Sequence, residues 1–130
     1  MDAVMYNDIL SHQLKGIMFH SDAYGVCCLN GYKRLKRSHC LQVQEETMAF
    51  MHTRCKAIEA LKEIPDIPKK PQITIAHDAS PNTILRLWHE WETETAGLYA
   101  KAVEAEPDCK LWKELHKSAM AELTRISYML

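Results

Sequence analysis

The placement of helix-breaking residues constrains the fold of this chain more than any other feature. All five prolines lie within residues 65–81 or at Pro107, and only four glycines occur in 130 residues. Proline interrupts a helix because it lacks the backbone N–H and clashes with the preceding turn. Outside these places the chain carries apolar residues at spacings of three and four, which is typical of amphipathic helices. The sequence therefore predicts an all-α fold.

Turn and capping residues set the expected bounds of four helices. Asn30-Gly31 is a strong turn signal because both residues tolerate positive φ at the end of a helix. Ser80-Pro81 reads as an N-cap followed by proline at the first helical position, and Asp2 reads as the N-cap of the first helix. We expect one domain over residues 1–130, with helices at about 3–29, 32–63, 81–105 and 108–129 and a crossover at 64–80.

The lengths of the connections predict the topology. The connections near Gly31 and Pro107 are short, so each should join two antiparallel neighbours. The crossover at 64–80 can stretch over roughly 55 Å at about 3.3 Å per residue, which is longer than a helix of about 25 residues. A four-helix bundle made of two antiparallel hairpins and one long crossover has the ferritin-like arrangement.

Charge and cysteine usage exclude several classes of function. The formal net charge is -1 and the pI is about 6.6, so no overall positive field favours nucleic acid as a partner. The five cysteines form no CxxC pair, which argues against a zinc knuckle and against a disulfide framework. No secretory leader and no apolar run of about 18 residues are visible, so we expect a cytoplasmic protein without a membrane partner.

The predicted second helix carries an acidic pair and a histidine within two turns. Steps of three and four from Leu41 reach Glu45, Met48, His52 and Cys55, which predicts this row as the buried face. Glu46 lies about 100° round the helix from Glu45. We therefore expect Glu45 and His52 to lie on or beside the bundle interior.

The other three helices also place polar residues on their predicted inner rows. On the third helix Leu87, Trp91, Glu94 and Leu98 form one row, so Glu94 should point inward while Glu90 and Glu92 fall elsewhere. Trp88, Trp91 and Trp112 are expected in the core. His20 lies on the first helix, and on the fourth Glu122 lies in the apolar row with His116 beside it. The candidate metal ligands are Glu94, Glu45, Glu46, His20, His52, Glu122 and His116.

These side chains admit two interpretations. Carboxylates and imidazoles together suit iron, manganese or zinc, and a buried carboxylate is costly unless it is paired or coordinated. The alternative is that they form a solvated rim in which Glu and His are hydrogen bonded to water or to one another, with no metal bound.

Two segments of the chain resemble the ferritin-like superfamily, notably rubrerythrins and bacterioferritins. They read NGYKRLKRSHCLQVQEETMAFMH and EWETETAGLYAKAVEAEPDCKLWKELHKSAMAELTRI. The resemblance implies a four-helix bundle in which helices one and three each give a glutamate and helices two and four each give a Glu-x-x-His pair. Together these residues hold two metal ions for oxidation of iron or reduction of peroxide.

The chain departs from that pattern at half of the ligand positions. Glu94 matches the glutamate of helix three, and Glu46 and Glu122 match those of helices two and four. Ala49 and Arg125 stand where the two histidines should be. The first helix has no glutamate, so the resemblance implies a degenerate di-iron motif.

Two functions follow as expectations. The first is a ferritin-like protein that binds iron or manganese in the bundle core, for iron handling or oxidative protection. The second is a non-catalytic ferritin-like scaffold or protein-interaction module that has lost the metal site. In either case we expect a homodimer or a higher homo-oligomer, because bundles of this size often associate along the first hairpin.

Overall fold

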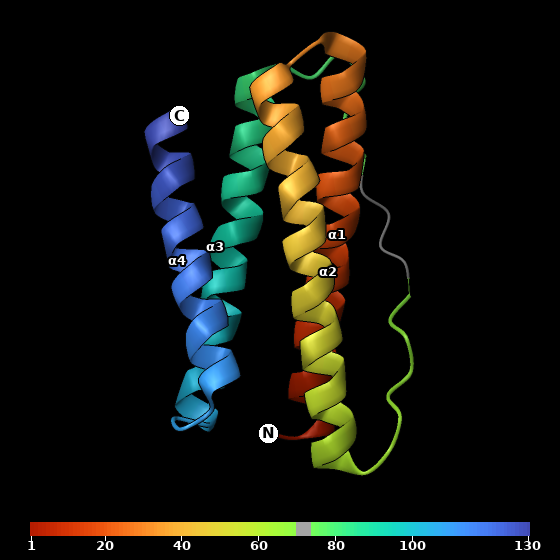
Figure 1. Ribbon diagram of the computed structural model, residues 1–130, viewed down its shortest axis with the longest axis vertical. Coiled ribbons are helices and arrows are strands. Elements are labelled where there is room, and N and C mark those ends of the chain that lie inside the picture. Colours follow the sequence, from red (N-terminus) through yellow and green to blue (C-terminus); the bar gives the residue numbers. More distant parts are fainter. Residues whose placement is uncertain (70–73) are drawn as a thin grey trace.

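The computed structural model describes residues 1–69 and 74–130 and contains four α-helices (Figure 1). Their bounds are Ala3–Asn30 for α1, Lys33–Leu61 for α2, Pro81–Ala105 for α3 and Lys110–Met129 for α4. No strand occurs in the described residues. The prediction of an all-α four-helix fold is confirmed. Part of the predicted crossover, residues 70–73, lies outside the described residues.

Helix α1 and helix α2 pack against each other as the first hairpin. Asp2 caps α1 through its Oδ1, which accepts from the Met5 N–H at 2.9 Å. Gly31 ends α1 in the left-handed conformation with φ of 74°, where a side chain would be strained. The short turn that follows sends α2 back along α1, so the helices are antiparallel (Figure 1).

Helix α3 and helix α4 form the second hairpin. Ser80 caps α3 through Oγ, which accepts from the Thr83 N–H at 3.2 Å, and Pro81 occupies the first turn as predicted. The connection to α4 is closed by a hydrogen bond from the Cys109 N–H to the Glu106 carbonyl at 3.1 Å. Helix α2 ends and α3 begins at opposite ends of the bundle (Figure 1), so these two helices run parallel.

The two hairpins meet at a close contact between α1 and α3. The ring of Trp91 fills the space that a Cβ at Gly16 would need, so this ring packs against the α1 backbone as only glycine permits. The Trp91 indole also donates to the His12 carbonyl at 3.3 Å. This contact fixes how the second hairpin is placed against the first.

Two hydrophobic clusters stabilise the bundle near its two ends. One contains Phe19, Ile84, Trp88, Trp91 and Ile126, and the other contains Tyr6, Ala57, Tyr99, Ala102 and Trp112. The three tryptophans are at most 4% exposed, which confirms the expectation that they belong to the core. Between the clusters the interior is polar. Its fully buried residues include Gln13, Gln42, Thr53, Glu92 and Thr95.

The predicted buried face of α2 is wrong. Leu41 and Met48 are 53% and 60% exposed, and Cys55 is also exposed. The face that α2 turns inward follows a different row, made of Leu35, His39, Gln42, Ala49, Thr53 and Ala57. The apolar pattern misled because α2 covers the polar layer of the interior, and so its inner row is itself largely polar.

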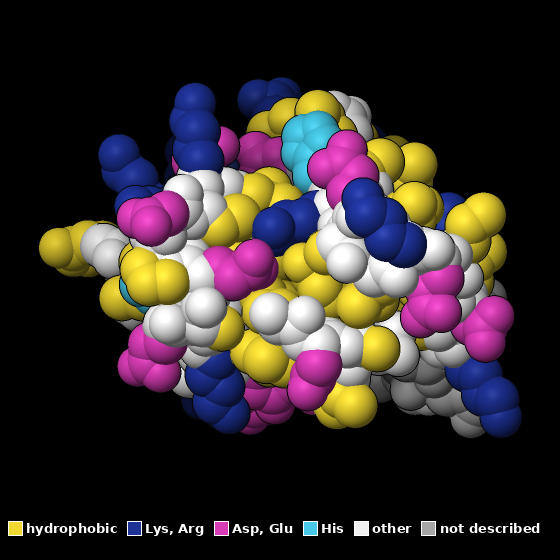
Figure 2. All heavy atoms as spheres, turned by 90° about the horizontal axis from the view of Figure 1, so that it is seen from below, with side chains coloured by type: hydrophobic (Ala, Val, Ile, Leu, Met, Phe, Trp, Pro, Cys, Tyr) yellow, Lys and Arg dark blue, Asp and Glu magenta, His cyan; other side chains and the backbone are white. Residues whose placement is uncertain are grey.

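The surface shows no concentration of one charge at the end of the bundle that carries the α3–α4 turn. Figure 2 views this end and shows basic and acidic side chains interspersed around apolar ones. Near this end Lys56 Nζ and Glu106 Oε2 form an ion pair at 3.4 Å. Within the described part of the chain, no helix is both long enough and apolar enough to cross a membrane.

Candidate functional site

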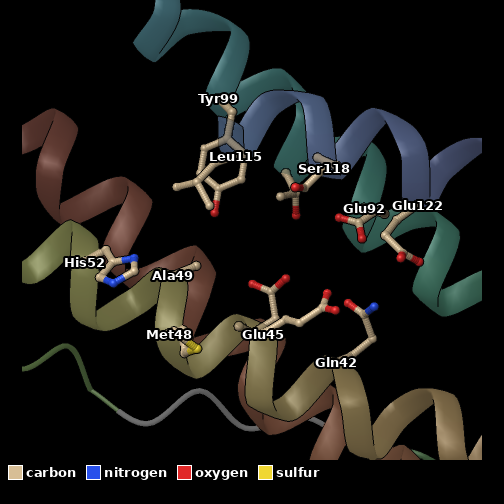
Figure 3. A pocket seen from close by; sticks show the side chains of 13 residues that line it. Gln42, Glu45, Met48, Ala49, His52, Glu92, Tyr99, Leu115, Ser118 and Glu122 are labelled. Carbon is tan, nitrogen blue, oxygen red and sulfur yellow. The ribbon is translucent and has the colours of Figure 1, made fainter. Parts of the chain in front are cut away.

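A cavity of about 290 Å³ lies between α2 and the α3–α4 hairpin. We call it the acidic cleft, because four glutamates from three helices line it (Figure 3). No lysine or arginine is among its lining residues. The lining consists of Gln42, Glu45, Glu46, Met48, Ala49 and His52 from α2, Glu92, Thr95 and Tyr99 from α3, and Leu115, Ser118, Ala119 and Glu122 from α4.

Glu92 is the most deeply buried carboxylate of the cleft. It follows Trp88 by one turn of α3 and precedes Thr95 and Tyr99 on the same inner row, and it is only 2% exposed. Figure 3 shows its carboxylate facing the cavity beside that of Glu122. The indole N–H of neighbouring Trp88 faces this carboxyl and favours its ionised form, and Trp88 Nε1 has no closer hydrogen-bond partner in the described residues.

The environment of Glu92 strongly favours its neutral form. Burial raises the pKa of this carboxyl to about 9, and the nearby charges of Glu46 and Glu122 act in the same direction. A buried ionised carboxylate without a partner costs several kcal/mol, so such a group either keeps its proton or meets a cation. At neutral pH Glu92 therefore holds a proton that a cation could displace.

The environment of Glu46, on the opposite wall of the cleft, also favours the neutral form of its carboxyl. It lies on the inner row of α2 between Gln42 and Ala49, and its Oε2 is buried without a hydrogen-bond partner. Burial raises the pKa of Glu46 to about 8, with further contributions from Glu45 and Glu122. Two carboxyls facing one cavity are thus neutral at pH 7 in the absence of a cation.

Only one carboxylate of the cleft has a cationic partner. Glu122 Oε2 accepts from Arg125 Nη2 at 2.8 Å, and Arg125 also lies over the ring of Trp88. Helix spacing explains the pair, since residues three apart are neighbours on a helix surface. The remaining glutamates of the cleft have no ion pair in the described residues. The cleft therefore has more carboxyl groups than cationic partners.

The floor of the cleft is ordered by a glutamine from α1. Gln13 Nε2 donates to Thr53 Oγ1 at 2.8 Å and to the Tyr99 hydroxyl at 3.0 Å, which joins α1, α2 and α3. Gln13 Oε1 is left without a partner. Burial raises the pKa of Tyr99, and the charge of Glu46 adds to this effect. Neutral oxygen donors therefore lie beside the carboxylates.

The structure brings together four of the seven predicted ligands. Glu45, Glu46, His52 and Glu122 all line the acidic cleft, although Glu45 and His52 are exposed at its rim. The other three lie elsewhere. His116 on α4 is half-buried outside the cleft lining.

Glu94 does not point inward, and the neighbouring Glu92 takes the inward position that was expected of it. The Glu94 side chain is 60% exposed and lies 3.8 Å from His12 Nδ1 on the α1 side of α3. The prediction failed because α3 is buried on two sides. Trp91 packs against α1, whereas Trp88 and Glu92 face α2 and α4, so the row through Trp91 does not lead into the cleft.

Sequence reasoning placed Glu92 outside the interior, and a signal for it existed. Glu92 is four residues after Trp88, three before Thr95 and seven before Tyr99, which together form a row of helical period. Trp88 and Trp91 lie only about a sixth of a turn apart around the helix, so the row through either one is consistent with a buried face.

His20 pairs with another histidine rather than with a carboxylate. Its Nδ1 lies 2.8 Å from the Nδ1 of His39 on α2, and both rings are fully buried among Phe19, Trp88 and Trp91. One Nδ1 must donate and the other accept, so the accepting imidazole is neutral. Burial lowers the pKa of His39 to about 4 and that of His20 well below its usual value.

The carboxylates of the cleft surround a space larger than one ion needs. Among residues 1–69 and 74–130, no three His, Cys, Asp or Glu side chains are placed closely enough together to hold a metal ion. The donor set nonetheless fits a hard cation, since it is made of carboxylate, amide and hydroxyl oxygens with one imidazole at the rim. Ligands from α2 and from the α3–α4 hairpin would have to approach each other around a bound ion.

Comparison with known proteins gives no relative for this chain. No protein-family model matches it, and neither a curated protein nor a solved structure is similar to it at a significant level.

Proposed function

We propose that this protein binds a divalent cation in the acidic cleft, with iron or manganese as the ion. The observation that carries the proposal is Glu92, a fully buried carboxyl without an ion pair in the described residues, which shares one cavity with three more glutamates. Glu92 and Glu122 would bind from one wall and Glu46 from the other, with Glu45 and His52 at the rim. Carboxylate oxygens suit manganese, and an added imidazole suits iron.

The electrostatics of the cleft support a cation rather than an anion or an apolar ligand. Glu46 and Glu92 both hold protons at neutral pH because burial and like charges raise their pKa values. Binding of a divalent ion would displace these protons, since carboxylate ligands must be ionised. The resemblance of the helices to the ferritin-like superfamily supports iron handling or oxidative protection as the process served.

The test compares two glutamates of α3 that differ only in where they point. Purified protein is stripped with a chelator and titrated with Mn²⁺, and with Fe²⁺ without oxygen, by isothermal calorimetry in buffers of different ionisation enthalpy. We expect binding to release protons at pH 7, and Glu92→Gln to abolish binding. Glu94→Gln is the matched control and should bind like the wild type. Absence of stoichiometric binding in the wild type would refute the proposal.

A second function is favoured by the surface of α2. Leu41, Met48 and Met51 are apolar and exposed in the described part of the chain, as expected of a protein-interaction module without a metal. Under this alternative the buried carboxyls are simply protonated, and neither Glu92→Gln nor Glu94→Gln would change any cation affinity.

A further inference from the structure

The outer face of α2 carries an apolar row that none of the residues 1–69 and 74–130 covers. Leu41, Met48 and Cys55 are seven residues apart and all exposed, and Met51 lies beside them at 50% exposure. In Figure 1 α2 lies in front of α1 with no helix over it. A heptad spacing of apolar residues is the pattern by which one helix packs along another at a shallow angle.

The row is symmetric about Met48. Leu41 lies seven residues before Met48 and Cys55 lies seven after it. If a second copy of α2 packed antiparallel with Met48 facing Met48, then Leu41 of each copy would face Cys55 of the other. A two-fold interface requires this kind of self-complementarity.

The charges of α2 are complementary in the same register. The beginning of the helix is basic from Lys33 to Arg37, and its last turn carries Glu59. Antiparallel pairing about Met48 places Arg37 opposite Glu59 in both halves of the interface. Parallel pairing would instead bring like charges together. Opposite charges across a helix pair select partner and direction.

The basic run lacks a role within one chain. No ion pair in the described residues involves Lys33, Arg34, Lys36 or Arg37. Positive charge at the N-terminus of a helix also opposes the helix dipole, which makes the run unfavourable for an isolated α2. Carboxylates from a second copy would remove this cost.

The surface on either side of the row can receive side chains from a second copy. On the α1 side lies a shallow hollow of about 330 Å³ lined by Ser21, Tyr24, Cys40, Val43 and Gln44. In the antiparallel register His52 of the second copy faces Gln44 at the edge of this hollow. On the other side Met48 and Glu45 line the acidic cleft, so the second copy would also flank its mouth.

From this symmetry and charge pattern we propose that the outer face of α2 is a two-fold interface with a second copy of this chain, antiparallel and centred on Met48. The interface consists of the apolar row Leu41, Met48, Met51 and Cys55 with ion pairs between the basic start and the acidic end of α2. It does not depend on whether the acidic cleft binds a cation.

The first experiment measures the mass of the full chain by sedimentation equilibrium. We expect a dimer, and we expect Met48→Glu to weaken it by about tenfold or more, because two carboxylates would then meet at the symmetry axis. Met120→Glu is the control, since Met120 is 48% exposed on α4 and outside the interface. A wild-type chain that stays monomeric up to about 100 µM would overturn the proposal and leave the face to another partner. A dimer insensitive to Met48→Glu would overturn it as well.

A charge exchange tests the direction of pairing. Arg37→Glu should weaken the dimer by roughly fivefold, as should Glu59→Arg, because each variant opposes like charges twice per dimer. The double variant should recover wild-type affinity. If the double variant instead dimerised more weakly than either single variant, so that the two effects were independent, the antiparallel register would be contradicted.

Disulfide trapping tests the register itself with a native cysteine. In a chain with Cys28→Ser and Cys40→Ser, the substitution Leu41→Cys should give an intermolecular disulfide with native Cys55 under mild oxidation. Adding Cys55→Ser should abolish the covalent dimer, since the two copies of residue 41 would be about 21 Å apart along the helix axis at 1.5 Å per residue. Leu29→Cys, at a 70% exposed position of α1, is the control that should not react. A covalent dimer that persists without Cys55 would refute this register.

Discussion

The bundle interior holds two buried pairs of like side chains, and they are stabilised to very different degrees. His20 and His39 share one hydrogen bond between their Nδ1 atoms and are enclosed by aromatic rings, while the Nε2 of each is buried without a partner in the described residues. Glu46 and Glu92 face a cavity instead of each other, and Glu46 Oε2 is buried without a partner in the described residues. A neutral imidazole can donate at one nitrogen and accept at the other, whereas an ionised carboxylate can only accept. The two histidines are thus held by a direct hydrogen bond, whereas the two carboxyls avoid repulsion by keeping their protons.

The two pairs also give the protein opposite responses to pH. The pKa of each of these histidines is lower in the folded chain than in the unfolded chain. As pH decreases below 6.5 the unfolded chain therefore takes up protons that the folded chain does not, and stability falls. Carboxyls with raised pKa stay protonated in the folded chain, so stability falls as pH rises from 4.5 through about 8 for Glu46 and 9 for Glu92. Considering these four groups alone, the two slopes cancel midway between 4.5 and 6.5, so we expect the metal-free protein to be most stable at about pH 5.5.

The largest effect should come from breaking the histidine pair. His20→Ala removes a fully buried ring and leaves the Nδ1 of His39 without a partner. Together the cavity and the unsatisfied nitrogen should lower the free energy of unfolding by about 4 kcal/mol. Urea denaturation at pH 7 measures this. A loss below about 1 kcal/mol would mean that the ring is not buried as described.

Replacing the buried acid Glu92 should raise the free energy of unfolding rather than lower it. Glu92→Gln keeps the shape of the side chain but needs no proton to stay neutral. At pH 7 the free energy of unfolding should rise by up to about 3 kcal/mol, which is 1.36 kcal/mol per pH unit above the unfolded-state pKa of 4.5. The measurement is urea denaturation between pH 5 and 9 in the presence of a chelator. Equal stability at pH 7 would show that Glu92 is ionised and compensated.

The loss of stability at low pH can also be tested at a third histidine, His12. His12 stacks on Trp91, and its Nε2 lies 2.6 Å from Thr95 Oγ1, which itself donates to the Trp91 carbonyl. The His12 Nε2–H therefore donates. Burial lowers the pKa of His12 to about 4, and so it costs stability as pH falls below 6.5. His12→Gln should remove about 2 kcal/mol of the loss between pH 7 and pH 5, as measured by thermal unfolding. If the variant lost as much stability between pH 7 and pH 5 as the wild type, this assignment of His12 would be contradicted.

The smallest effect is expected at the rim of the acidic cleft. Glu45 lines the same cavity as Glu92 but is exposed to solvent. Glu45→Gln should change the free energy of unfolding by no more than about 0.5 kcal/mol at pH 7. Urea denaturation beside Glu92→Gln gives the comparison. A gain as large as that of Glu92→Gln would show that the charge of the cluster matters rather than burial of one carboxyl.

The helices could be predicted from sequence because their ends are determined locally. Asp2, Gly31 and Ser80 act at the helix ends where they were expected, since capping and left-handed backbone depend on one or two residues. The inner faces depend on which helix covers which. On α2 the buried row is polar at His39, Gln42 and Thr53, so a search for apolar residues selected the opposite side.

The candidate site was found only in part for a related reason. Glu45 and Glu46 are 100° apart on α2 and Glu92 and Glu94 are 200° apart on α3, so choosing the wrong buried row on either helix exchanges their roles. The sequence identified four residues that line the acidic cleft, but not the buried Glu92. The pairing of His20 with His39 depends on the packing of α1 against α2, which no local pattern encodes.

The contact between Gly16 and Trp91 links the packing of α1 to the width of the acidic cleft. At this point the Trp91 ring of α3 packs directly on the α1 backbone, whereas a cavity lies between α2 and the α3–α4 hairpin. A methyl group at Gly16 would overlap the Trp91 ring and would have to displace it. Gly16→Ala would therefore shift α3 against α1 and alter the opening of the cleft without touching any of its glutamates.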